Sequence, residues 1–213
     1  MASEVEICNL ALSHLGDTAT VASLEPPEGS AQAEHCARFY PMARDALLEM
    51  HAWNFATRRV VPAELVNNWT QWAHAYAKPA DCLRVLGVMH RLATDDFTMS
   101  TGMPLQGVAT EVPYSLEVGD DLQDVLYTNQ EEAAIRYVAR VVDTAKFSPL
   151  FVLTLSHYLA GMLAGPLLKG DVGKAEAKAQ MQIMQVCLAQ ARQADASQRH
   201  LEVQPAVPWI TRR

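Results

Sequence analysis

Residues 39–59, FYPMARDALLEMHAWNFATRR, contain most of an amphipathic helix and the aromatic motif that follows it. Apolar side chains at alternating steps of four and three residues predict one buried face, formed by Cys36, Tyr40, Ala43, Leu47 and Met50. The remaining sides of the helix are expected to carry the charged residues Arg38, Arg44, Asp45 and Glu49. Pro41 lies inside the periodic run and predicts a kink, because proline removes a backbone donor.

The aromatic motif is Trp53-Asn54-Phe55, immediately after the helix. Its spacing allows two large rings to bury apolar area while the amide between them bonds to backbone groups of the exit turn. We therefore expect the end of the helix to be fixed to the core by four structural anchors: Tyr40, Trp53, Asn54 and Phe55.

Composition limits the possible classes of protein. A chain of 213 residues can bury one core, or one core and a small module. The net charge of −7 argues against a protein that binds nucleic acid through clustered basic residues. Four widely spaced cysteines indicate reduced core thiols, and the N-terminal residues lack the pattern of a secretion signal.

Periodicity predicts a mainly α fold: a helical bundle of about five helices, a β-rich insertion in the middle and an extended C-terminal arm. The expected helices cover residues 4–15, 31–51, 130–142, a segment that begins at Pro149, and 172–197. Short β-type runs at 83–89, 114–118 and 125–127 form the insertion, with a hairpin loop at 119–121. The corresponding division is 1–59 and 129–197 for the bundle, 60–128 for the insertion and 198–213 for the arm.

Residues 147–168 carry no formal charge and contain two glycines, Gly161 and Gly165, four positions apart. The segment has the length of a membrane-spanning helix, but the other helices are amphipathic and need a central partner. We interpret it as the central helix of the bundle, with the glycines allowing close helix packing.

Catalytic patterns are not evident. The seven histidines are scattered, without the spacing that places two imidazoles on one metal, and no phosphate-binding glycine loop or nucleophile elbow occurs. A zinc site would require the fold to bring His35 and Cys36 to Cys82 and His90. We therefore expect no enzyme activity, no metal and no cofactor.

Four stretches occur in an order that resembles the head-to-tail adaptor family of short-tailed phages, the tail tubular protein A type. They are residues 39–55, 72–85, 147–151 and 209–212. The chain departs from the family's pattern at His51-Ala52, where a proline often follows the histidine, and this predicts a looser exit turn.

The resemblance implies a virion protein of the tail or neck, assembled in the host cytoplasm, with no role in a membrane. Its implied partners are copies of itself in a ring, usually of twelve, the portal protein, the tail nozzle protein, tail fibres as a further contact, and double-stranded DNA that passes through the lumen without specific binding. A small α-helical binding or regulatory module of a phage or prophage is the alternative.

The tail of the chain has two prolines, spaced apolar groups and no helical period, which suits either an extended arm or a disordered terminus. The resemblance favours an arm that docks on the portal. Its docking residues would be Val203, Pro205, Val207, Pro208, Trp209, Ile210 and Arg212.

Overall fold

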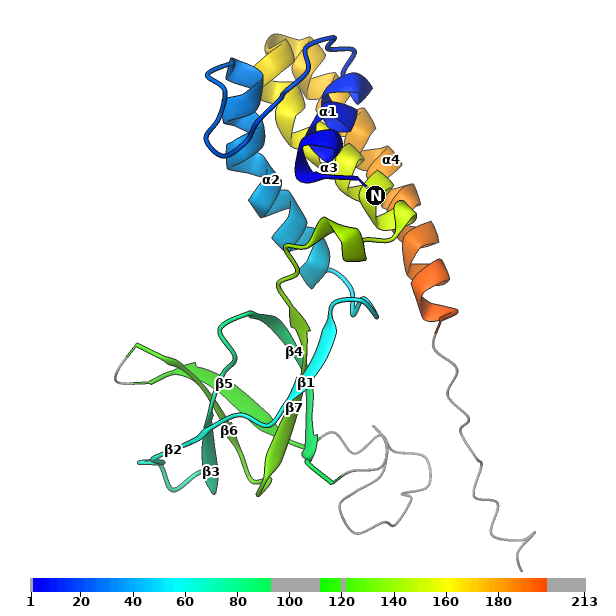
Figure 1. The fold of residues 1–213 in the computed structure, drawn as a ribbon. Coiled ribbons are helices and arrows are strands. Elements are labelled where there is room, and N and C mark those ends of the chain that lie inside the picture. Colours follow the sequence, from blue (N-terminus) through cyan, green and yellow to red (C-terminus); the bar gives the residue numbers. More distant parts are fainter. Residues whose placement is uncertain (1, 93–111, 120–121, 199–213) are drawn as a thin grey trace, which may run out of the picture. The chain divides into compact units, whose positions relative to one another are not determined.

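The computed structural model describes residues 2–92, 112–119 and 122–198. These residues form two compact units. A helical unit combines residues 2–56 with 140–198, and a β unit, inserted between them, covers residues 57–139 with the gaps just given (Figure 1). Helices make up about 45% of the fold, so the class is mixed α/β rather than mainly α.

The helical unit contains four α-helices, and three of them begin at a serine cap. They are α1 (Glu4–His14), α2 (Ala31–Glu49), α3 (Pro149–Leu168) and α4 (Gly170–Ala196). Ser3 and Glu6 form a capping box at α1, and the hydroxyls of Ser30 and Ser148 cap α2 and α3. A short 3-10 turn, η1 (Thr144–Lys146), precedes α3. All three other helices pack against α3, which is therefore the centre of the unit.

Helix α3 has the length and mean hydropathy of a helix that could cross a membrane, and it is the single such helix among the described residues. Half of its most apolar window is buried inside the protein, which supports the interpretation as the central helix of the bundle. Close packing occurs at Gly161, where an added Cβ would lie 2.8 Å from Met181, and at Gly173 of α4, where it would lie 2.8 Å from the Ala164 carbonyl oxygen. Gly165 has open space instead, so its predicted role in close packing is wrong.

Helix α2 follows most of the predicted pattern and continues through Pro41. Cys36, Tyr40, Ala43 and Leu47 are buried as expected. Arg44, expected on a solvated side, is instead 7% exposed, because its guanidinium is paired within the helical unit, whereas Met50 is 37% exposed. The buried face is thus rotated toward the arginine relative to the sequence-based expectation.

The described residues of the β unit form seven strands in two antiparallel sheets. One sheet has the order β1-β7-β4 and the other β2-β3-β6-β5. The strands are β1 (Thr57–Val60), β2 (Glu64–Leu65), β3 (His74–Ala77), β4 (Cys82–His90), β5 (Tyr114–Val118), β6 (Asp124–Thr128) and β7 (Ala133–Ala139). A shared core, which includes Tyr76 and Leu126 of one sheet and Val85 and Ile135 of the other, lies between the sheets.

The predicted helix over 130–142 is wrong, because this segment forms strand β7 at the centre of the three-stranded sheet. All residues of β7 except Arg136 are buried. A strand that is buried on both faces has apolar side chains at successive positions, because both sets of side chains lie in the core. Such a continuous apolar run in the sequence can be mistaken for part of a buried helix. The predicted strands at 83–89, 114–118 and 125–127 are confirmed as β4, β5 and β6, and β5 pairs with β6 as a hairpin.

Candidate functional site

An aromatic cluster joins two distant stretches of the helical unit. Trp53 is completely buried, and its ring meets Phe151 edge to face at 5.1 Å between centroids. Phe55 is half-buried and lies 5.8 Å from Phe147 and 5.1 Å from Phe151. The Trp53-Asn54-Phe55 motif and the segment that opens α3 therefore form one packing unit, which favours a core role for both aromatic anchors.

The turn after α2 is held by polar contacts with the C-terminal end of α4. The backbone N–H of Asn54 donates to the Asp195 carboxylate at 3.1 Å, and the Asn54 side-chain amide donates to the Asp195 carbonyl oxygen at 2.6 Å. Arg192 donates to the Met50 carbonyl oxygen at 2.8 Å, and the Trp53 indole donates to the Leu47 carbonyl oxygen at 3.0 Å. We call the contacts that Asn54 and Met50 make with Asp195 and Arg192 the α2–α4 clasp.

The fourth anchor, Tyr40, is 2% exposed. Burial raises the pKa of its phenol, and its hydroxyl has no hydrogen-bond partner among the described residues. Arg44 lies over the ring at 5.9 Å and donates to Asp45 at 2.9 Å. Asp45 also accepts from Arg140 at 2.9 Å, so the buried arginine is compensated by a carboxylate that two basic side chains share.

Two histidines stack where α1 ends against α3. The rings of His14 and His157 are 3.9 Å apart and nearly parallel. His14 Nε2 is 3.0 Å from the Ser156 hydroxyl, and His157 Nδ1 is 2.8 Å from the Gln180 side-chain oxygen. Burial, followed by the charge of His157, lowers the pKa of His14. The folded state therefore favours the uncharged form of His14, because its protonation would place positive charge in a partly buried site against a second imidazole.

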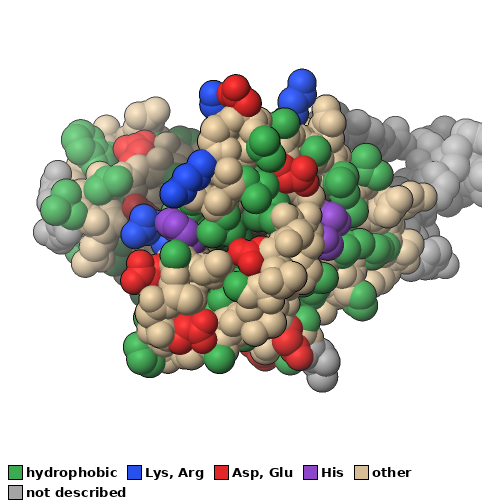
Figure 2. Space-filling view, turned by 90° about the horizontal axis from the view of Figure 1, so that it is seen from above, with side chains coloured by type: hydrophobic (Ala, Val, Ile, Leu, Met, Phe, Trp, Pro, Cys, Tyr) green, Lys and Arg blue, Asp and Glu red, His purple; other side chains and the backbone are tan. Residues whose placement is uncertain are grey.

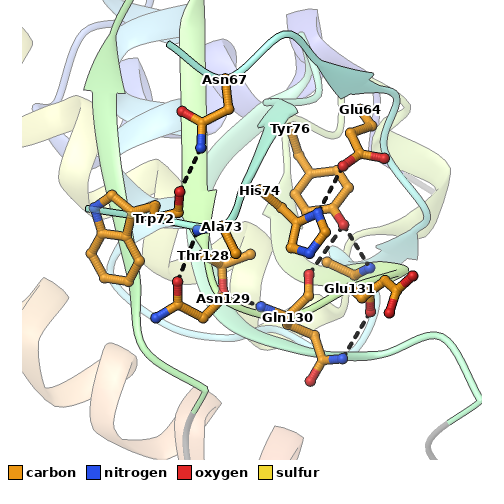
Figure 3. Close-up of polar contacts among 11 residues, drawn as sticks. Glu64, Asn67, Trp72, Ala73, His74, Tyr76, Thr128, Asn129, Gln130 and Glu131 are labelled. Carbon is orange, nitrogen blue, oxygen red and sulfur yellow. Dashed lines mark hydrogen bonds and ion pairs between the residues drawn. The ribbon is translucent and has the colours of Figure 1, made fainter. Parts of the chain in front are cut away.

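In the β unit, a polar network fixes the connection between β2 and β3 (Figure 3). The Asn67 amide donates to the Trp72 carbonyl oxygen at 2.6 Å, and the Ala73 N–H donates to the Asn129 side-chain oxygen at 2.9 Å. Close to it, His74 pairs with Glu64 at 2.8 Å. The Tyr76 hydroxyl donates to the Gln130 carbonyl oxygen at 3.1 Å. These contacts order the connection between β2 and β3.

No group of three or more potential ligand residues within the described part of the chain could hold a metal ion. The residues considered for zinc divide between the units, with His35 and Cys36 in the helical unit and Cys82 and His90 in the β unit. Cys36 instead lies beside Cys8, and the hydrogen bond between the two thiols, followed by burial, raises the pKa of Cys8. Burial also raises the pKa of Cys82, to about 11.

The docking-arm residues Val203, Pro205, Val207, Pro208, Trp209, Ile210 and Arg212 lie outside the described residues. The sequence pattern singled out the four anchors, but the predicted bonding of the Asn54 amide to the exit turn is wrong, because the amide donates to Asp195 in α4. Asp195 is 141 residues from Asn54 and has no motif of its own. Sequence reasoning also missed the histidine stack, for which no signal exists in the spacing of His14 and His157.

Comparison of the sequence with models of known protein families gives no match. Comparison with curated proteins gives no significant match either.

Proposed function

We infer that this chain is a structural virion protein, a ring subunit of the head-to-tail adaptor that joins a phage portal to its tail nozzle. The ring forms part of the channel for DNA and contains twelve copies, the number usual in the family that the sequence resembles. The protein is not an enzyme in this proposal. It is assembled in the host cytoplasm and functions in the neck of the virion.

The observation that carries the proposal is the aromatic cluster. Two of the four stretches on which the resemblance rests, around Trp53 and around Phe151, lie far apart in sequence and pack together at 5.1 Å. A chance similarity of isolated motifs gives no reason for them to meet. The helical unit also contains both described ends of the chain around an inserted β unit, the arrangement predicted from periodicity.

The helical unit has exposed apolar side chains that suit side-by-side packing of copies. On α2, Met42 is 58% exposed, and on α4, Val172 and Val186 are 70% and 59% exposed. Hydrophobic side chains reach the surface among interspersed acidic and basic ones in the view from above (Figure 2). Exposed apolar groups rimmed by polar residues are typical of association surfaces. We assign the subunit contacts of the ring to this unit.

The remaining partners follow from the same proposal. The C-terminal arm docks on the portal through Trp209 and its neighbours, while the β unit contacts the nozzle and tail fibres. Double-stranded DNA passes through the lumen without specific binding. The net charge of −7 on each subunit is multiplied around a closed ring, and this favours an acidic wall that repels DNA and lets it slide.

The test is the mass of the full chain in solution, with and without an assembled portal ring, by native mass spectrometry. Attachment of about twelve copies to each portal ring supports the adaptor function. A chain that stays monomeric and leaves the mass of the portal unchanged contradicts it. The alternative, a small α-helical binding or regulatory module of a phage or prophage, gives no role to the inserted β unit.

A further inference from the structure

The four-stranded sheet of the β unit has two apolar faces, and one of them is only partly covered by described residues. Successive strand residues point to opposite faces. Leu126 of β6 is directed into the core between the two sheets, whereas its neighbours Val125 and Tyr127 lie on the second face with Ala75 of β3. This second face is packed by Leu65 and Trp72, and it continues into a groove.

The groove has a volume of about 350 Å³, within the range of ligand-binding clefts. Its lining includes Val66 and Trp69 from the β2–β3 loop, Val118 from β5, and Val125 and Tyr127 from β6. Val125 and Tyr127 are each 6% exposed and form the floor, whereas Val66 is 88% exposed, Val118 63% and Trp69 60%. Large apolar groups with this exposure, gathered over a hydrophobic floor, indicate a docking surface.

The loop that carries Trp69 is held in place by the polar network of Figure 3. Asn67 accepts from the Trp69 backbone N–H at 3.0 Å and donates to the Trp72 carbonyl oxygen at 2.6 Å. The indole of Trp69 is therefore presented from an ordered backbone, and binding through it requires little further ordering of the loop. Glu117, a lining residue, adds an exposed carboxylate to an otherwise uncharged lining.

These features match one segment of the chain itself. Residues 202–213 read EVQPAVPWITRR and contain two prolines in Pro-x-x-P spacing, Pro205 and Pro208, followed by Arg212 and Arg213. Proline-rich segments of this spacing dock in grooves lined by aromatic side chains, because their restricted backbone loses little entropy on binding. A basic group after the second proline complements the Glu117 carboxylate.

We propose that the groove on the second face of the four-stranded sheet binds the Pro205–Pro208 segment of this chain's C-terminal tail. The prolines and Val207 contact Trp69 and Tyr127, and the terminal arginines approach Glu117. This goes beyond the adaptor function and does not depend on it. If the adaptor function holds, the tail cannot occupy the groove and the portal together, so the groove holds the tail of a subunit that has not yet met the portal.

Photo-crosslinking of the full chain, without portal, tests the proposal. p-Benzoylphenylalanine is introduced at Ala206, between the prolines, and the products of irradiation are mapped by mass spectrometry. Cross-links are expected in the groove segments, residues 65–69 and 117–127. Cross-links confined to other segments, or none, overturn the proposal whatever the outcome of portal binding.

Variants in the same background make the test quantitative. Trp69→Ala and the double substitution Pro205→Ala with Pro208→Ala should each lower the cross-link yield about tenfold or more, since an aromatic anchor dominates such contacts. Val61→Ala, at a 55% exposed residue that does not line the groove, should leave the yield unchanged. Glu117→Gln should lower the yield at low salt and Glu131→Gln should not. An unchanged yield in Trp69→Ala overturns the proposal.

Discussion

Asp195, in the last turn of α4, accepts the backbone N–H of Asn54 with both carboxylate oxygens, at 3.1 and 3.2 Å. The exit turn of α2 is therefore closed by a side chain from the far end of the sequence. The pair His51-Ala52, where the family that the sequence resembles often has His-Pro, predicted a looser turn. The α2–α4 clasp supplies a restraint that does not require a proline at that position.

Loss of the clasp should destabilise the helical unit. Asp195→Ala leaves the Asn54 N–H without its acceptor and should lower the free energy of unfolding by about 1–3 kcal/mol. Asp195→Asn retains one acceptor oxygen and should cost less. Denaturant unfolding measures both, with Gln193→Ala, an exposed position on α4, as a control expected within about 0.5 kcal/mol of the wild type. Equal stability of Asp195→Ala and the control would show that the clasp contributes nothing.

Truncation of Trp53 should lower the free energy of unfolding more than loss of the clasp does. Trp53→Ala removes a completely buried side chain and should cost about 3–5 kcal/mol, with loss of soluble protein. Phe55→Ala should cost less, because Phe55 is only half-buried. Thermal unfolding and gel filtration measure the two variants. A Trp53→Ala protein that melts normally but does not assemble would make Trp53 an interface residue rather than a core anchor.

The α3–α4 contact should distinguish two glycines that look alike in sequence. Gly173→Ala would place a Cβ 2.8 Å from the Ala164 carbonyl oxygen, so backbone must move, at a cost of about 1–3 kcal/mol. Gly165→Ala meets nothing within 4 Å apart from its chain neighbours and should cost less than Gly173→Ala, although Pro166 disfavours a helical alanine before it and offsets the gain in helix propensity. Thermal midpoints of the two variants test this difference. Equal losses in both would contradict the close approach at Gly173.

Mild acid should destabilise the helical unit through the histidine stack. The pKa of His14 is lowered from 6.5 by burial and by His157, so the folded state favours the uncharged ring. This stability is present above pH 6.5 and is lost as the pH falls from 6.5 toward the lower pKa of the folded state. The melting temperature, measured by the circular dichroism of the helices, should fall between about pH 7.5 and pH 5. The fall should be smaller in His14→Gln. Identical pH profiles in the two proteins would rule out this contribution.

The C-terminal arm should be dispensable for folding and required for portal attachment. Deletion of residues 202–213 should leave the helical content and melting temperature nearly unchanged, because the segment has no core-type periodicity. Trp209→Ala should weaken portal binding by about 2–4 kcal/mol, and Arg212→Ala less, in a salt-dependent way. A pull-down on assembled portal is the measurement. Undiminished binding of the truncated chain would end the docking-arm hypothesis, and collapse of its fold would place the tail in the core.

The sequence by itself determined the features that depend on neighbours along the chain. The caps at Ser3, Ser30 and Ser148 start three helices where the spacing predicted them, because capping involves residues only three positions apart. The β5–β6 hairpin could equally be predicted from the sequence, since its strands are adjacent along the chain. The apolar periodicity of α2 identified most of its buried face and the aromatic anchors that follow.

Only the tertiary structure decided what depends on distant partners. Strand β7 became a strand because β1 and β4 flank it on both sides, and its apolar run alone did not distinguish this from a helix. Arg44 is buried because Asp45 and Glu4 compensate its charge there. The meeting of Asn54 with Asp195 spans 141 residues, and periodicity carries no information about contacts of that range.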